Sequence, residues 1–386
     1  MEPTVQSSKS KKNLIVGIVI IVAIVLVIAA SAGNSKKDTI KIGGAYILSG
    51  PQALIGDLQK NASQIALDEI NANGGINGQK VELVLEDSAY DPKKSVDAYN
   101  ALKLRGVKYI LADGSPVVGA IRETAVKDGN LIFAVGATTP GYFDGSPLSC
   151  RIALTAKSFG PGYTELLGKK AYKSVVMLLP DNEYGKGIAA EFTKAFEPTG
   201  GKIAAIEFYN ATGNGDFRTN ITKLKAQQAN ADAMILVNVA NTVEPMLKQV
   251  KELGWKKPLV SDYYLAQNPA LKDLSLAEGM DFVDYDYSRD ALATDSDVTK
   301  AFKKTYETKF GSKPVYLAAG YYDSLKIVAE AISKVGNDPK KVGDYISSLK
   351  GYQGITGSLT FNSDCEVNRA LVFRTVKGGT YVDLVK

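Results

Sequence analysis

The feature that most constrains this chain is a repeated alternation of short apolar strands with amphipathic helices. Strand-like segments occupy residues 39–45, 81–86, 107–112 and 131–135, and apolar residues recur at helical spacing between them. Strands that alternate with helices at this spacing predict βαβ units around a parallel sheet. The pattern restarts after about residue 155, so we predict two doubly wound α/β lobes.

The second half of the chain continues the alternation and then changes character. Its predicted strands are 174–179, 202–208, 232–237 and 259–263, with an extended segment at 282–287. We expect two such lobes to form a cleft, because loops and helix N-termini meet at the carboxyl ends of parallel strands. The predicted helices are 57–72, 91–105, one between the strands at 107–112 and 131–135, 185–197, 216–228, 243–253, 295–309, 315–334 and 339–349. Residues 357–385 are predicted to form short strands and a hairpin.

An unbroken apolar run near the N-terminus predicts a membrane segment or an export signal. Leu14 to Ala30 contains 17 apolar residues or glycines and follows three lysines. Two readings stay open for residues 14–32, a retained signal anchor after a cytoplasmic stretch (1–13), or a cleaved signal peptide. In both readings a short linker (33–38) follows, and residues 39–386 are expected outside the cytoplasm, tethered to the membrane or secreted.

Composition excludes several classes of function. The chain contains no histidine and only two cysteines, so catalytic triads with histidine, histidine metal sites and four-cysteine clusters are excluded within one chain. The net charge is +5, and residues 1–38 carry five lysines against Glu2 and Asp38. The nearly neutral remainder offers no field for nucleic acid. We expect no metal, because the residue types of these metal sites are missing. We expect no nucleotide or other cofactor, because no glycine-rich phosphate loop follows any predicted strand.

Six motifs in order resemble one known family. They are Ser49-Gly50-Pro51 followed by Gly56, the run from Asp68 to Pro92, GATTP at 136–140, PDNEYGKG at 180–187, GYYDSLKIVAEAI at 320–332 and GITGSLTF at 354–361. The exported part therefore resembles the type I periplasmic binding proteins, and within them the branched-chain amino-acid (Leu/Ile/Val) binding proteins of ABC transporters. The resemblance extends from about Ile40 to Val376.

The resemblance implies two lobes joined by three crossovers. We place the crossovers near 150–155, 282–288 and 355–361. Lobe one is then expected at 39–152 and 287–356, and lobe two at 153–286 and 357–386.

The resemblance also implies a carboxylate-binding site on lobe one. Ser115 precedes a predicted helix, and Gly136, Thr138 and Thr139 follow a predicted strand. Hydroxyls and free N–H groups at helix N-termini form an anion site without a formal cation. The alternative is that these hydroxyls are ordinary helix caps.

Lobe two departs from the family pattern. Tyr184 matches a tyrosine that closes on the ligand, although it can equally be a packing residue. The position of the family's acidic amine partner falls on Tyr263, next to Asp262, and Asn238 lies near the place of another family tyrosine. A buried ammonium group needs a charge-assisted acceptor. Either Asp262 serves, or the solute is not a standard α-amino acid.

Cys150 and Cys365 both lie near predicted crossovers. In an oxidising location a disulfide between them would restrain the hinge. Two unpaired thiols remain the alternative, because a disulfide requires close Cα atoms.

We therefore expect an extracytoplasmic solute-binding protein of an ABC importer, not an enzyme. It is expected to act as a monomer, to bind a small amino acid, branched-chain or related, by clamshell closure, and to dock on a permease. The alternatives are the ligand-sensing ectodomain of a receptor, a binder of amides or urea-like solutes and, least favoured, a flavodoxin-like enzyme.

Overall fold

The structure is a computed structural model that describes residues 39–386 except 268–270, 272, 288–289 and 385–386. The segment at 14–32, predicted to be an anchor or signal peptide, lies outside the described residues. Among the residues that are described, no helix is both long enough and apolar enough to span a bilayer.

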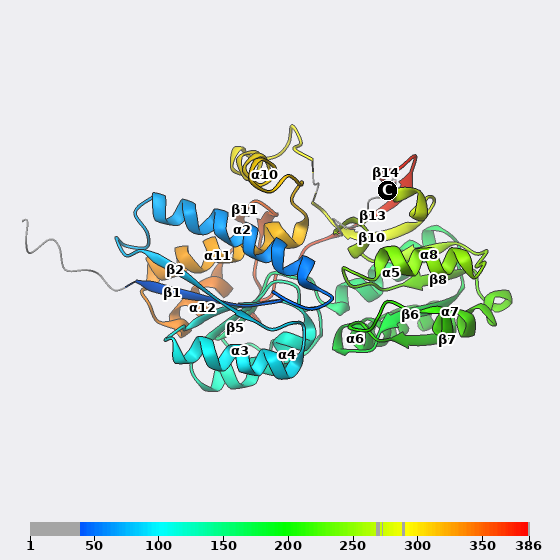
Figure 1. The fold of residues 1–386 in the computed structure, drawn as a ribbon, viewed down its shortest axis with the longest axis horizontal. Helices are drawn as coiled ribbons and strands as arrows, with labels where there is room; N and C mark the ends of the chain where they lie inside the picture. Colours follow the sequence, from blue (N-terminus) through cyan, green and yellow to red (C-terminus); the bar gives the residue numbers. More distant parts are fainter. Residues whose placement is uncertain (1–38, 268–270, 272, 288–289, 385–386) are drawn as a thin grey trace, which may run out of the picture.

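The first lobe is built on a five-stranded parallel sheet (Figure 1). Its strands, in the order β2-β1-β3-β4-β5, are β2 (Val81–Asp87), β1 (Ile40–Tyr46), β3 (Tyr109–Ala112), β4 (Leu131–Ala134) and β5 (Ser149–Arg151). All residues of β3 and β4 are buried, as expected of strands that are covered on both faces. Its helices are α2 (Ala53–Ala72), α3 (Pro92–Leu104), α4 (Ser115–Lys127), α10 (Asp297–Phe310), α11 (Tyr316–Val335) and α12 (Pro339–Ser348).

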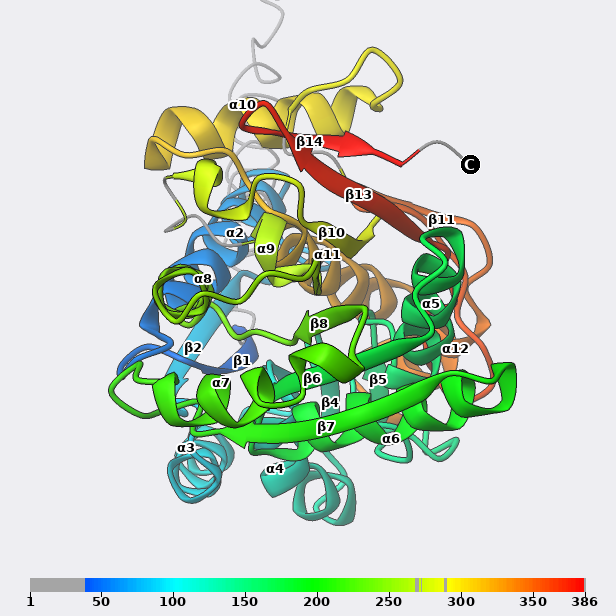
Figure 2. The same ribbon diagram turned by 90° about the vertical axis from the view of Figure 1, so that its right-hand side faces the viewer.

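The second lobe is built on a seven-stranded mixed sheet. Figure 2 views the molecule from this side, with β7 and β14 at opposite edges of the sheet. In spatial order its strands are β14 (Thr380–Asp383), β13 (Leu371–Lys377), β10 (Asp281–Tyr285), β9 (Leu259–Ser261), β8 (Ala233–Leu236), β6 (Ser174–Pro180) and β7 (Lys202–Tyr209). Its helices are α5 (Ala156–Lys169), α6 (Glu183–Phe196), α7 (Arg218–Lys225), α8 (Val243–Glu252) and α9 (Tyr264–Gln267). These two sheets confirm the predicted pair of α/β lobes.

Local signals in the sequence explain where several elements begin and end. The Asp91 side chain accepts a hydrogen bond from the Lys94 N–H and Pro92 occupies the first turn, so α3 begins as predicted. Helix α2 ends before Gly74 and Gly75, both of which have positive φ. A Cβ atom at Gly75 would lie 2.0 Å from the Gln79 carbonyl oxygen, so this turn requires glycine.

Helix α5 was not predicted from the sequence. Pro161 lies inside it, between Gly160 and Gly162, and these residues interrupt a helical pattern. The helix forms because packing against α6, β10 and β13 outweighs the poor local propensity. A Cβ atom at Gly160 would lie 2.4 Å from the Glu191 carbonyl oxygen, so glycine permits the close contact with α6.

The third crossing between the lobes lies later in the chain than predicted. Strands β11 (Tyr352–Gly354) and β12 (Gly357–Leu359) pair with each other, and the Phe361 ring then packs 6.1 Å from Phe133 of β4. Arg151 of β5 forms a bridge with Glu366. These contacts keep the chain with the first lobe, so we place the crossing between Val367 and β13 and correct the 355–361 boundary. The β-branched residues after 357 indicated extended structure, but not which sheet would receive it.

Candidate functional site

The predicted carboxylate-binding residues of lobe one lie together. Ser115 begins α4 directly after β3, and Thr138 and Thr139 lie in the loop after β4, the neighbouring strand. The Ser115 Oγ accepts hydrogen bonds from the N–H groups of Thr138 and Thr139, both at 3.2 Å. Parallel pairing of β3 and β4 brings these loops to one edge of the sheet, where two N–H groups and two hydroxyls converge.

One hydroxyl in this cluster is buried without a partner. Thr138 has no exposed surface, and its Oγ1 makes no hydrogen bond within the described residues. The neighbouring Thr139 hydroxyl donates across the lobe boundary to the Glu183 carbonyl oxygen at 3.2 Å. A buried polar atom without a partner costs about 1–3 kcal/mol, so Thr138 is suited to a polar group supplied by a ligand.

Arg151, which was not among the predicted site residues, contacts the carbonyl groups of the loop that carries Thr138. This side chain is 1% exposed, and its guanidinium donates to the carbonyl oxygens of Ala137 and Thr139 at 3.1 and 2.9 Å. It also pairs with Glu366 and lies 4.4 Å from the centre of the Phe143 ring. Because Arg151 binds carbonyl oxygens, the loop's N–H groups are turned the other way, toward Ser115.

The predicted residues of lobe two form a second cluster around Asp262. The Asp262 Oδ2 accepts from the Tyr184 hydroxyl at 2.8 Å and from the Asn238 N–H at 2.9 Å. Burial raises the pKa of Asp262 to about 7, against the lowering effect of these hydrogen bonds. The Asn238 Oδ1 is buried without a partner within the described residues.

Tyr263 has a different environment from Asp262. Its ring stacks on Phe159 of α5 at 5.4 Å and on Tyr264 at 4.7 Å, and it meets Tyr285 edge-on. Tyr263 is thus part of an aromatic core beneath the loop. Of the two neighbours, Asp262 is the one that contacts Tyr184 and Asn238.

A buried acidic residue of lobe one was also missed. Asp113 lies between β3 and Ser115, is 2% exposed, and accepts a hydrogen bond from Gln59 Nε2 at 3.0 Å. Burial raises its pKa to about 6. The Tyr90 ring lies beside the next residue, Gly114, where a Cβ atom would be 2.5 Å from the ring. No sequence motif indicated Asp113, because an aspartate after a strand is a common turn residue.

The two lobes contact each other around these clusters. Gln52 Nε2 donates to the Ala211 carbonyl oxygen at 3.2 Å and also bonds to Asn241. The Tyr285 and Tyr316 rings, from β10 and α11, stack at 3.7 Å. Most of the predicted residues are buried near these contacts, whereas Gly136 and Thr139 are partly exposed. The buried ones are Ser115, Thr138, Tyr184, Asn238, Asp262 and Tyr263.

The two cysteines form a disulfide. Cys150 of β5 is bonded to Cys365, with Cα atoms 4.6 Å apart. The bond links the strand that carries Arg151 to the segment that carries Glu366. Of the two alternatives left open by the sequence, a disulfide or two unpaired thiols, the structure contains the disulfide.

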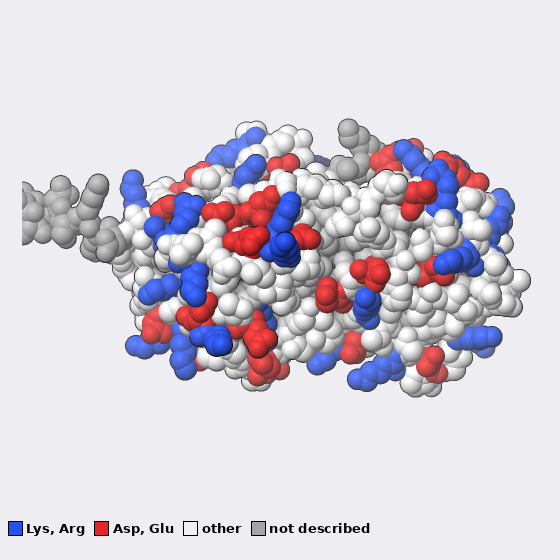
Figure 3. All heavy atoms as spheres, turned by 60° about the horizontal axis from the view of Figure 1, so that its bottom comes forward, with Lys and Arg blue, Asp and Glu red and all other residues white. Residues whose placement is uncertain are grey.

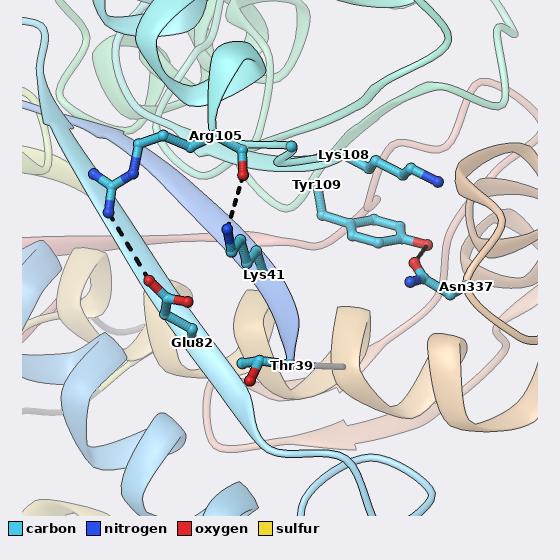
Figure 4. Close-up of a pocket in the computed structure, with 8 residues that line it drawn as sticks. Thr39, Lys41, Glu82, Arg105, Lys108, Tyr109 and Asn337 are labelled. Atoms are coloured by element: carbon cyan, nitrogen blue, oxygen red, sulfur yellow. Dashed lines mark hydrogen bonds and ion pairs between the residues drawn. The ribbon is translucent and has the colours of Figure 1, made fainter. Parts of the chain in front are cut away.

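One cavity lies away from the predicted site. It has a volume of about 430 Å³ and lies at the amino ends of β1, β2 and β3, opposite the Ser115 loop. Figure 4 shows Lys41 donating to the Arg105 carbonyl oxygen, with Tyr109 and Asn337 bonded to each other on the far side. No predicted residue lines it.

Acidic and basic side chains are interspersed over the face of the molecule drawn in Figure 3. Within the described ranges, no group of three or more acidic or cysteine side chains is placed to hold a metal ion.

Comparisons with known proteins agree with this architecture. The periplasmic binding protein family matches residues 39–380. The leucine-, isoleucine-, valine-, threonine- and alanine-binding protein of Pseudomonas aeruginosa is 28% identical over 335 residues, which are 84% of this chain and 86% of that protein.

Solved structures give the same result. The substrate binding protein of a branched-chain amino acid transporter from Streptococcus pneumoniae, in complex with isoleucine, is 26% identical. It matches with a TM-score of 0.76 over 90% of this chain and all of that one. A leucine binding protein from Thermotoga maritima shares the fold at 22% identity, with a TM-score of 0.80 over 90% of this chain and 98% of that one. The chain therefore belongs to the periplasmic binding protein family, has the type I fold, and is a solute-binding protein similar to the branched-chain amino-acid binding members.

Proposed function

We propose that this chain is the extracytoplasmic solute-binding protein of an ABC importer. It binds a small amino acid, branched-chain or related, between the lobes, and it carries out no bond chemistry. Its partners are the solute and a membrane permease, and residues 14–32 attach it to the membrane or direct its export. It works as a monomer.

The observation that carries the proposal is the buried, unpartnered Thr138 hydroxyl near the Ser115 hydroxyl. The N–H groups of Thr138 and Thr139 donate to the Ser115 Oγ, so the Ser115 and Thr138 hydroxyls are the donors left for an anion. This chemistry suits the carboxylate of a zwitterion, which carries its own counter-charge. Two relatives whose names include leucine or isoleucine point to the same solute class.

Closure of the lobes is part of the proposal. The open form binds solute on lobe one, and lobe two then swings over it about the three crossings. The solute favours the closed form because Tyr184 and Asn238 reach it only there. A micromolar dissociation constant corresponds to about 8 kcal/mol, which a few charge-assisted hydrogen bonds and an enclosed apolar side chain can supply.

Calorimetric titration tests the solute class. The full chain in mild detergent is unfolded and refolded to remove bound solute. It is then titrated with leucine, isoleucine, valine, phenylalanine, their amides and acetamide. We expect binding of one or more free amino acids and none of the amides, because an amide lacks the carboxylate that Ser115 and Thr138 are proposed to hold. Binding of amides or acetamide alone would replace the amino-acid assignment with an amide assignment.

A further inference from the structure

The two buried aspartates at the lobe boundary differ in how completely their oxygen atoms are used. Asp262 accepts hydrogen bonds from the Tyr184 hydroxyl, the Asn238 N–H, the Asn238 side-chain amide at 3.5 Å and the Tyr264 N–H. An ionised carboxylate has about four acceptor positions, so lobe two itself fills those of Asp262.

Asp113 has fewer partners. It accepts from Gln59 Nε2 at 3.0 Å and from the Gly114 N–H, and both donors are neutral. Within the described residues, no basic side chain is paired with either aspartate. A buried carboxylate with two neutral donors retains acceptor positions and lacks a counter-charge, and this combination suits an ammonium group.

Asp113 also lies beside the predicted carboxylate site. A Cβ atom at Gly136 would lie 1.8 Å from the Asp113 Oδ1, so the carboxylate is packed against the start of the loop that ends in Thr138. Ser115, two residues after Asp113, contacts the same loop two residues further on. The ammonium and carboxylate groups of an α-amino acid are attached to one carbon atom, so a single zwitterion can donate to Asp113 and accept from the neighbouring hydroxyls.

Asp113 lies beside an aromatic ring near the lobe boundary. A Cβ atom at Gly114 would lie 2.5 Å from the Tyr90 ring, so that ring covers the Asp113 turn. The loop packed against Asp113 also reaches lobe two, because the Thr139 hydroxyl donates to the Glu183 carbonyl oxygen. Aromatic faces next to a carboxylate favour a cation.

We infer that Asp113 of lobe one, and not Asp262 of lobe two, binds the ammonium group of the solute. This inference rests on the proposed function and deepens it. Both charged ends of the zwitterion are then held on lobe one, and Asp262 is a positioning residue that holds Tyr184 and Asn238. The amine subsite has moved across the cleft from the lobe-two position that the family resemblance implies, where Tyr263 now stands.

The test compares leucine with 4-methylpentanoate, which has the same side chain and carboxylate but no ammonium group. Calorimetry on the full chain gives the ratio of their affinities for the wild type, Asp113→Asn and the matched control Asp262→Asn. In the wild type we expect leucine to bind at least about 30-fold more tightly, as for a buried charged hydrogen bond. Asp113→Asn should reduce the ratio to less than about 5-fold, whereas Asp262→Asn should leave it within about 3-fold of the wild type.

Each other outcome has a distinct meaning. A ratio that collapses in Asp262→Asn and survives in Asp113→Asn overturns the inference and leaves the proposed function intact. Equal binding of both compounds to the wild type also overturns it, because no ammonium group is then recognised. Binding of neither compound, nor of any other amino acid, overturns the proposed function as well. If Asp113→Asn does not unfold cooperatively in urea, Asp113→Ser replaces it, since serine keeps an acceptor for Gln59.

Discussion

The loop that carries Thr138 in lobe one and the loop that carries Asn238 in lobe two are each held by a buried ionisable side chain, and the two side chains are of opposite type. Arg151 binds the lobe-one loop through the carbonyl oxygens of Ala137 and Thr139. Asp262 binds the lobe-two loop through the Asn238 N–H. Arg151 leaves the N–H groups of Thr138 and Thr139 to the Ser115 Oγ, so the Ser115 hydroxyl hydrogen is available to an anion, whereas Asp262 accepts from the Asn238 N–H itself. The sign of the buried supporting side chain thus decides whether it occupies the carbonyl groups or the N–H groups of its loop.

The largest expected effect comes from removing the cation. Arg151→Met should lower the free energy of unfolding by about 3–5 kcal/mol, because Glu366 is left without its buried partner and two carbonyl oxygens lose their donor. Urea unfolding measures the change. Arg105→Met is the control, because its ion pair with Glu86 is half exposed and should contribute less than about 1 kcal/mol. Equal losses in the two variants would show that Arg151 does not hold the loop.

The disulfide lies in lobe one and is expected to support the loop that carries Thr138, not the loop that carries Asn238. The double variant Cys150→Ala/Cys365→Ala should cost about 2–5 kcal/mol, since the bond joins residues 215 apart in the chain. Hydrogen exchange tests where the loss falls. Protection of the Thr138 and Thr139 amides should decrease more than that of the Asn238 amide. A uniform decrease would mean that the bond acts on the whole protein and not on the loop.

Removing the anion should have a smaller effect. Asp262→Asn should lower the free energy of unfolding by about 1–3 kcal/mol, because the asparagine amide faces donors that have lost an acceptor. Asp57→Asn serves as the control, since Asp57 is exposed and pairs only with exposed Lys60. If the two variants have the same stability, Asp262 does not organise the lobe-two loop.

The smallest effect is a pH dependence of the solute-free protein. Burial raises the pKa of Asp113 to about 6 and that of Asp262 to about 7, so the folded protein holds protons that the unfolded chain has already released. Their contribution to stability is complete below about pH 4 and is lost as the pH rises toward about 7. Urea unfolding across this range should show the decrease, and Asp262→Asn should make it shallower. A rise in stability over the same range would contradict both pKa directions.

The grouping of the candidate site residues could be predicted because sheet topology determines which loops are neighbours. Consecutive parallel strands bring their carboxyl ends together, so Ser115 after β3 and Thr138 after β4 had to be neighbours. The same rule brought Asn238 after β8 next to Asp262 after β9. Apolar periodicity and helix caps located most helices and strands, because these signals act over a few residues.

The sequence by itself determined the two α/β lobes, the order of most elements and which loops lie together at the candidate site, since local periodicity and strand order carry that information. Only the tertiary structure decided the rest. Helix α5 contains Pro161 and forms through tertiary packing. Phe361 and Cys365 contact the first lobe, so the chain crosses to the second lobe only after them. Arg151 meets Glu366 across 215 positions, and burial raises the pKa of Asp113. Burial and long-range pairing depend on what the folded chain places around a residue, and no local pattern records that.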